Sequence, residues 1–109
     1  MQMNEYQHET RRTATGGEAS DDMRLAIFAL GVAGEAGEVA DLIKKWLGHG
    51  RSRDIPDLVG ELGDVLWYIA AIADRCGVTL EEVALYNVKK LRTKYPNGFN
   101  HHDANAPRT

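Results

Sequence analysis

The chain has 109 residues, of which 43% are hydrophobic and 27% are charged, and its formal net charge is −3. This length and composition are typical of one globular domain that can bury a core without disulfides or a structural metal. With a slight negative net charge, the chain is not expected to have the basic surface on which most nucleic-acid binders depend. No apolar run approaches the roughly 18 residues of a membrane span. We therefore expect neither a nucleic-acid polymer nor a membrane among its partners.

Cysteine usage and the N-terminal residues bear on the cellular compartment. The single cysteine, Cys76, cannot form a disulfide within the chain. The first residues lack the charged and then apolar pattern of a signal peptide. Both features favour a cytoplasmic protein, and Cys76, next to Gly77 at an expected helix end, is interpreted as a small buried hydrophobic residue.

Apolar residues recur at spacings of three and four along nearly the whole chain, and no segment alternates apolar and polar residues as a half-buried strand would. The pattern predicts an all-α fold, a helical bundle of about four to five helices. A first short helix is expected to start at Asn4, which can cap it together with Gln7, and to end by Gly16 and Gly17.

Three longer helices follow, each with its own start and stop signals. Their expected ranges are about 20–47, 54–76 and 79–94. Ser20 and Asp54 are placed to cap the first two, and Thr79 forms a capping box with Glu82 at the start of the third. The signals that end these helices are Gly48, Gly77 and the Tyr95-Pro96 pair. We assign 1–99 to a single helical domain and 100–109 to a flexible C-terminal tail.

The longest of these helices carries Gly31, Gly34 and Gly37 in its interior. Each glycine costs about 1 kcal/mol relative to alanine inside a helix, so something should compensate. Close packing against another helix, or a local kink, is one interpretation. A ligand that approaches the bare backbone is the other.

Two pairs of carboxylates stand at i, i+3, with Glu35 and Glu38 on the second helix and Glu61 and Asp64 on the third. Residues at this spacing lie one above the other on a helix. If the two helices pack antiparallel, four acids converge, and their mutual repulsion requires a cation. Hard oxygen ligands favour Mg²⁺ or Mn²⁺. The alternative for each pair alone is a solvated helix face.

An acid cluster of this kind suits metal-assisted displacement at phosphorus, in which the metal neutralises phosphate charge and activates a water molecule. A carboxylate slightly away from the metal could accept the proton of that water. Cationic side chains should complete the phosphate site, although each can also belong to a solvated helix face. The candidates are Lys44, Lys45, Lys89, Lys90, Arg92 and Lys94.

Three runs of residues, GVAGEAGEVADLIKKW, ELGDVLWYIAAIADRCGVTLEEV and NVKKLRTKYPNGF, resemble the MazG-like nucleotide pyrophosphohydrolases of the all-α NTP pyrophosphatase superfamily. The signature of that family is ExxE, a spacer and ExxD. Here 22 residues separate Glu38 from Glu61, and the resemblance covers about residues 6–99.

The resemblance implies Mg²⁺-dependent hydrolysis of a nucleoside triphosphate to the monophosphate and pyrophosphate, with Mn²⁺ as a possible substitute metal. By this comparison Glu35, Glu38, Glu61 and Asp64 match the metal-binding acids. Glu38 also matches the residue that orients or deprotonates the attacking water. The resemblance further implies a dimer or tetramer, in which the interface can complete the base pocket.

The fourth helix resembles the phosphate-binding helix of the family through Asn87 and Lys94, and Lys90 is a further candidate. Many relatives are expected to have arginine at the position of Lys94, and lysine offers a point charge where arginine offers a bidentate fork. Tyr68 resembles an aromatic residue that stacks on the base, and Trp46 is a second base-binding candidate. Core or dimer packing is the alternative for both rings.

Two other functions stay open on the sequence. One is a pyrophosphohydrolase of narrower specificity in the same superfamily, acting on dUTP, dCTP or phosphoribosyl-ATP. The other is a non-catalytic helical module in which the acids bind Mg²⁺ and a nucleotide without turnover. Only an enzyme should release monophosphate and pyrophosphate.

Overall fold

The computed structural model describes residues 1–14 and 20–105, and within them it contains five α-helices and no β-strand. The all-α prediction is therefore confirmed. The expected stop at Gly16 and Gly17 lies outside the described residues. The helices are α1 (Met3–Thr10), α2 (Asp21–Gly48), α3 (Ile55–Arg75), α4 (Leu80–Lys94) and α5 (His101–Ala104).

The three long helices begin at the predicted capping residues. The side chains of Ser20, Asp54 and Thr79 each accept a hydrogen bond from the backbone N–H three residues later, at 3.2, 3.0 and 3.0 Å. At α4 the bond is reciprocal, since the Glu82 carboxylate accepts from the Thr79 N–H at 3.0 Å. These bonds satisfy N–H groups that have no partner inside a helix, which is why the sequence specifies the starts so well.

The first helix begins earlier than predicted, and Asn4 does not cap it. Gln2 precedes α1, and its backbone N–H donates to the Glu5 carboxylate at 3.2 Å. Asn4 lies inside the first turn, where its amide group bonds to Glu81 of α4. A partner distant in the sequence therefore takes the side chain that local reasoning assigned to capping.

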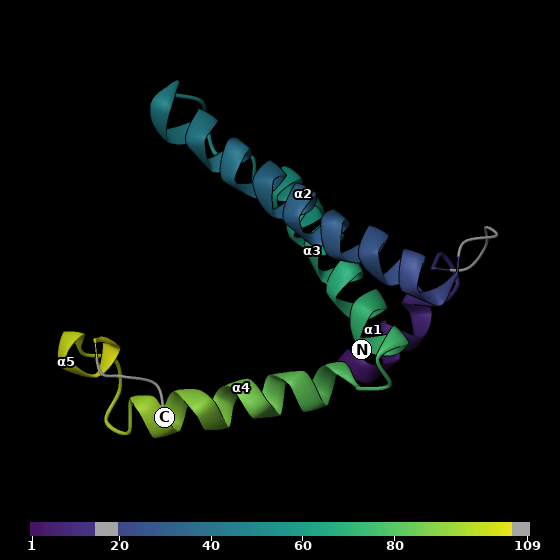
Figure 1. The fold of residues 1–109 in the computed structure, drawn as a ribbon. Helices are drawn as coiled ribbons and strands as arrows, with labels where there is room; N and C mark the ends of the chain where they lie inside the picture. Colours follow the sequence, from purple (N-terminus) through teal and green to yellow (C-terminus); the bar gives the residue numbers. More distant parts are fainter. Residues whose placement is uncertain (15–19, 106–109) are drawn as a thin grey trace.

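Helices α2 and α3 form a long antiparallel hairpin, which is the dominant packing unit of the fold (Figure 1). An aromatic cluster joins the two helices: the ring of Trp67 meets Phe28 edge-on with centroids 5.7 Å apart, and meets Tyr68 edge-on at 5.0 Å. The Trp67 indole N–H also donates to the Thr13 hydroxyl at 2.7 Å.

A small buried core lies at the base of the hairpin, where α1, α3 and α4 meet. Its buried members are Ala70, Ala73 and Leu80, and Tyr6 and Ile69 pack against them. Helix α1 contacts both α3 and α4 here and connects them. The core is made mostly of alanine, which lets the helices approach closely but buries little apolar area.

From this base α4 extends away from the hairpin, so that the hairpin and α4 form the two arms of an open V (Figure 1). The radius of gyration is 17.0 Å, whereas about 13 Å is expected for a compact chain of this length. Both arms expose large apolar side chains. Prominent among them are Ile27, Leu30, Leu47 and Val59 on the hairpin, and Val83, Leu85, Val88 and Leu91 on α4. A single chain therefore does not close the predicted bundle.

Two further features differ from expectation. Cys76 is exposed instead of buried, because it follows the last residue of α3 at the open end of that helix. Residues 101–104, within the predicted tail, form one helical turn that Asn100 caps by accepting from the Asp103 N–H at 2.7 Å. None of the described helices is long and apolar enough to span a membrane.

Candidate metal centre

Three of the four predicted acids converge on one place in the hairpin. Glu35 of α2 and Glu61 and Asp64 of α3 each offer a carboxylate oxygen, and these oxygens all lie within 4.8 Å of one another. Glu35 and Glu61 are half-buried and Asp64 is exposed. The i, i+3 spacing on α3 and the antiparallel course of α2 bring the groups together, as the sequence predicted.

The charges of this acid cluster disfavour one another. The pKa of Glu61 is raised, first by burial and then by the negative charges of Glu35, Glu38 and Asp64. Within residues 1–14 and 20–105, none of the ion pairs includes one of these acids. Three hard oxygen donors with uncompensated charge fit a divalent cation such as Mg²⁺.

Glu38 stands apart from the group of three. It lies one turn after Glu35 on α2, is exposed, and does not belong to the set of oxygens within 4.8 Å. Its charge nevertheless contributes to the raised pKa of Glu61, so the two carboxylates are within electrostatic reach. The sequence predicted that all four acids bind metal and gave Glu38 a second role at the attacking water, whereas in the structure only three converge and Glu38 lies beside them.

The two base-binding candidates are far apart in a single chain. The ring of Tyr68 lies against Gly31 of α2, so closely that a Cβ there would collide with it. Trp46 follows fifteen residues after Gly31 on the same helix, which corresponds to about 22 Å of helix. One chain does not bring the two rings into one pocket. At Gly34 and Gly37, in contrast, an added Cβ would meet no other part of the described chain within 4 Å, apart from the glycine's own stretch of helix.

The phosphate-binding candidates lie on the other arm of the V. Asn87 and Lys90 are exposed on α4, and Lys94 is half-buried with its ammonium 5.7 Å from the centre of the Tyr95 ring. Because α4 extends away from the hairpin, a single chain does not place them at the acid cluster (Figure 1). Of the basic candidates on α2, Lys45 pairs with Asp41 at 2.8 Å.

One neighbour of the acid cluster was not predicted. The pKa of Tyr6 on α1 is raised by burial and, to a smaller degree, by the negative charge of Asp64. The phenol of α1 therefore lies within electrostatic reach of the cluster. No spacing rule links residues 6 and 64, since α1 reaches α3 only through the tertiary fold.

An antiparallel helical hairpin that brings the first acid of ExxE and both acids of ExxD to one point defines the class of the protein: an all-α domain with an acid cluster suited to a divalent cation. Comparison with known families agrees with this class and identifies the family. Residues 26–99 match the MazG nucleotide pyrophosphohydrolase domain, which is more than half of the chain. The chain belongs to this family.

A relative supports the assignment over nearly the whole length. The chain is similar to the "Gene 37 protein" of Mycobacterium phage L5, with 34% identity over 105 residues that cover 90% of this chain and 92% of the relative. No solved structure matches the chain. The family match begins within α2, so α1 lies outside the matched segment.

Proposed function

We propose that the protein is a Mg²⁺-dependent nucleoside triphosphate pyrophosphohydrolase, which cleaves between the α and β phosphates and releases the monophosphate and pyrophosphate. Membership of the MazG family supports the reaction class. The observation that carries the proposal is the convergence of Glu35, Glu61 and Asp64, whose carboxylate oxygens lie within 4.8 Å of one another. A site of this kind suits displacement at phosphorus.

The residues fit a bound Mg²⁺ or Mn²⁺. Burial and the neighbouring carboxylates raise the pKa of Glu61, so both disfavour its negative charge in the absence of a cation. Glu35, Glu61 and Asp64 would hold the cation, and the ion would supply neutralisation of phosphate charge and a more acidic water molecule. All three ligands are carboxylates, which hard divalent cations prefer to softer donors.

Glu38 is proposed as the group that orients the attacking water and accepts its proton. Its position beside the three converging acids, and not among them, supports this role, because a general base must keep its oxygen free. It is exposed, so water reaches it. The resemblance to the family also gives Glu38 as a fourth metal ligand, and its offset position favours the role of base.

The active enzyme is proposed to be a homodimer or a homotetramer. The chain exposes 8297 Å², against about 6,000 Å² expected for a compact chain of this mass. The excess is larger than the roughly 800 Å² that each partner buries in a standard interface. An apolar hollow of about 430 Å³ at the far end of α4, lined in part by Val88, Leu91 and Phe99, adds to the uncovered surface.

A second copy would also complete the site. In one chain, α4 carries Asn87, Lys90 and Lys94 away from the acids (Figure 1). A partner's α4 placed along the hairpin can supply the corresponding side chains to the phosphates. The same arrangement can bring Tyr68 and Trp46 of different copies to one base, which a single chain does not do. The dimer thus accounts for both uncovered surface and separated site residues.

The proposal is tested by product analysis. The protein is incubated with Mg²⁺ and a panel of ribo- and deoxyribonucleoside triphosphates that includes dUTP, dCTP and bases with oxidative damage, and phosphoribosyl-ATP is added as a further substrate. Ion-exchange chromatography then identifies the products. Monophosphate and pyrophosphate are expected, and the panel distinguishes broad from narrow specificity.

Matched variants assign the activity to the site. Glu38→Gln removes the proposed base and should lower turnover by about 10²-fold or more. Glu9→Gln removes an exposed carboxylate of α1 and should leave it unchanged. Diphosphate and phosphate as products would show that a different bond is cleaved. Nucleotide binding without any turnover would favour the non-catalytic module.

A further inference from the structure

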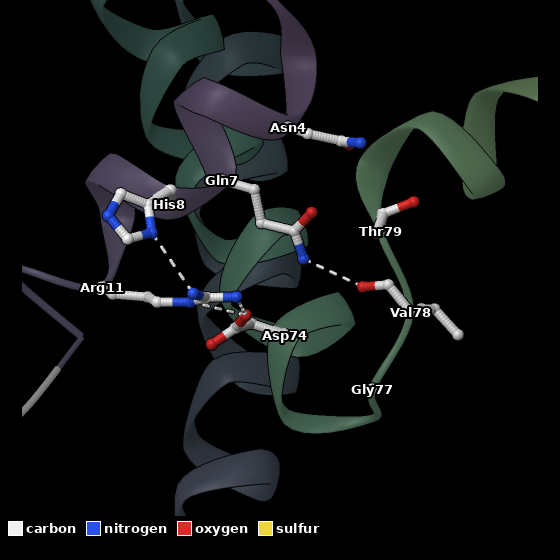
Figure 2. A pocket seen from close by; sticks show the side chains of 8 residues that line it. All are labelled: Asn4, Gln7, His8, Arg11, Asp74, Gly77, Val78 and Thr79. Carbon is white, nitrogen blue, oxygen red and sulfur yellow. Dashed lines mark hydrogen bonds and ion pairs between the residues drawn. The ribbon is translucent and has the colours of Figure 1, made fainter.

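Helix α1 holds the turn between α3 and α4 through the side chain of Gln7. Gln7 is only 4% exposed. Its amide nitrogen donates to the Val78 carbonyl oxygen at 2.9 Å, and its amide oxygen accepts from the Leu80 N–H at 2.8 Å. Figure 2 shows the first of these bonds reaching from α1 to the turn. One side chain therefore fixes both ends of the three-residue segment that leads into α4.

A second α1 residue extends this contact by one step. The Asn4 amide oxygen accepts from the Glu81 N–H at 3.1 Å, and its amide nitrogen donates to the Glu81 carboxylate at 3.3 Å. With the Thr79 hydroxyl bound to the Glu82 N–H, each of the first three N–H groups of α4 has a side-chain acceptor. Two of these three acceptors belong to α1, so α4 starts on a platform that α1 provides.

Packing contributes only one strong anchor to this junction. Leu80 is 2% exposed and enters the core with Ala70 and Ala73. Beyond Leu80, the large apolar residues of α4 are exposed, from Val83 to Leu91. Side-chain packing along α4 therefore does not set its direction within one chain.

A hollow lies beside the turn, so the hydrogen bonds of Asn4 and Gln7 hold the start of α4 where packing does not fill the space. It has a volume of about 350 Å³, and Asn4, Gln7 and Thr79 contribute to its lining (Figure 2). On its other side Arg11, the residue that follows α1, forms an ion pair with Asp74 of α3 at 2.7 Å. This ion pair joins α1 to α3 and does not touch α4. The bonds of Asn4 and Gln7 are thus distinct from the general docking of α1.

We propose that Asn4 and Gln7 are positioning residues that fix the angle at which α4 leaves the base of the hairpin. That angle determines where the polar and apolar faces of α4 meet the second copy of the chain. This inference rests on the proposed function, in which α4 supplies phosphate-binding residues to a partner's acid cluster. It assigns a role in nucleotide binding to α1, which lies outside the segment matched by the family.

The angle of α4 is measured directly by the distance between two spin labels. Met23 near the start of α2 and Thr93 near the end of α4 are both exposed and outside the proposed site. They are replaced by cysteine in a Cys76→Ser background, and labelled chains are diluted with unlabelled ones so that only distances within one chain are read. Double electron–electron resonance should give one narrow distribution of distances between the two labels for this parent protein.

Two variants remove, separately, the hydrogen bonds that Gln7 and Asn4 make to the start of α4. Gln7→Met keeps the size of the buried side chain and removes both bonds to the turn. Asn4→Ala acts at an exposed position and removes only the bonds to Glu81, so it tests the proposal even if Gln7→Met fails to fold. Both should broaden the distance distribution. Arg11→Gln, which removes the ion pair to Asp74, is the matched control and should leave the distribution unchanged.

The kinetic consequence separates positioning from general loss of structure. Asn4→Ala and Gln7→Met should raise the KM for the nucleotide about fivefold each, with kcat at saturating nucleotide within about twofold of the parent. An equal fall of kcat in these two variants and in Arg11→Gln would overturn the proposal. So would an unchanged distance distribution, or a broadened one with an unchanged KM.

Failure of the proposed function is recognised separately. If the parent protein hydrolyses no nucleotide, the kinetic measurements contradict the proposed function. The distances between the spin labels still test whether Asn4 and Gln7 fix the angle of α4. If the parent turns over nucleotide and neither variant changes the label distance or the KM, the positioning role of Asn4 and Gln7 is wrong and the proposed function is retained.

Discussion

The ring of Tyr68 lies against Gly31 where α3 packs on α2, so closely that a Cβ at residue 31 would collide with the ring. Tyr68 is also a member of the aromatic cluster that joins the two helices. For Gly31, this contact favours close helix packing over the approach of a ligand, the two interpretations that the sequence left open. Tyr68 is one turn from Asp64, so the fit of this ring also bears on the geometry of the acids.

Replacement of this glycine should therefore destabilise the hairpin. Gly31→Ala gains about 1 kcal/mol of helix propensity, but overpacking against Tyr68 costs about 1–3 kcal/mol. We expect a lower free energy of unfolding in urea. Gly34→Ala is the matched control and should stabilise the chain, since a Cβ at this position would meet no other part of the described structure within 4 Å beyond its own stretch of α2. A Gly31→Ala variant that is more stable than the parent would contradict the contact.

Removal of charge from the acid cluster should have opposite effects with and without metal. The pKa of Glu61 is raised by burial and by neighbouring negative charges, and Glu61→Gln removes the charge that both disfavour, so the variant should unfold at a higher temperature than the parent in a chelating buffer. With Mg²⁺ added, the parent should gain stability and the variant should gain much less. Differential scanning calorimetry in both buffers measures this. Equal gains from Mg²⁺ in the two proteins would place the cation elsewhere.

The raised pKa of Glu61 also predicts a pH dependence in the absence of divalent cations. The folded protein holds this proton more tightly than the unfolded chain. The resulting stability is present below the ordinary glutamate pKa of about 4.3 and is lost as the pH rises through the higher pKa of the folded state. The free energy of unfolding of the parent, relative to Glu61→Gln, should therefore fall over this range.

Bound Mg²⁺ should reverse that trend, because the metal competes with the proton for the same carboxylates. The stabilisation by Mg²⁺ should be larger at neutral pH than near the ordinary glutamate pKa. A difference between parent and Glu61→Gln that does not change with pH would be inconsistent with the raised pKa.

The open V predicts self-association. Sedimentation should show a species larger than the single chain at micromolar concentration, and specific activity should fall when the protein is diluted to the range of the monomer. Leu91→Glu places a charge in the apolar hollow of α4 and should weaken the assembly. Thr93→Glu, on the same helix but outside that hollow, should not. A stable single chain with full activity would contradict the shared site.

Local signals in the sequence predicted most of the fold. Ser20, Asp54 and Thr79 cap their helices because each needs only the N–H three residues later. The acid cluster was predictable for a related reason. The i, i+3 spacing of Glu61 and Asp64 places both on one face of α3, and a hairpin is the simplest way to add Glu35.

The direction of α4 was not predictable from such signals. It depends on Gln7 bonding to Val78 and Leu80 more than seventy residues later. For the same reason the sequence predicts that Asn4 caps the start of α1, whereas it bonds to Glu81 at the start of α4. The phosphate-binding candidates on α4 depend on this long-range contact and on a second copy, whereas the three acids depend only on one hairpin.

The central claim is that the acid cluster supports cleavage of a nucleoside triphosphate to monophosphate and pyrophosphate. The most direct measurement is the stoichiometry of the two products from one good substrate with Mg²⁺, in the parent, in Glu35→Gln and in Glu9→Gln. We predict equal amounts of monophosphate and pyrophosphate from the parent and from Glu9→Gln, and almost none from Glu35→Gln. Folded, Mg²⁺-stabilised parent protein that releases neither product, or Glu35→Gln with full activity, would contradict the account.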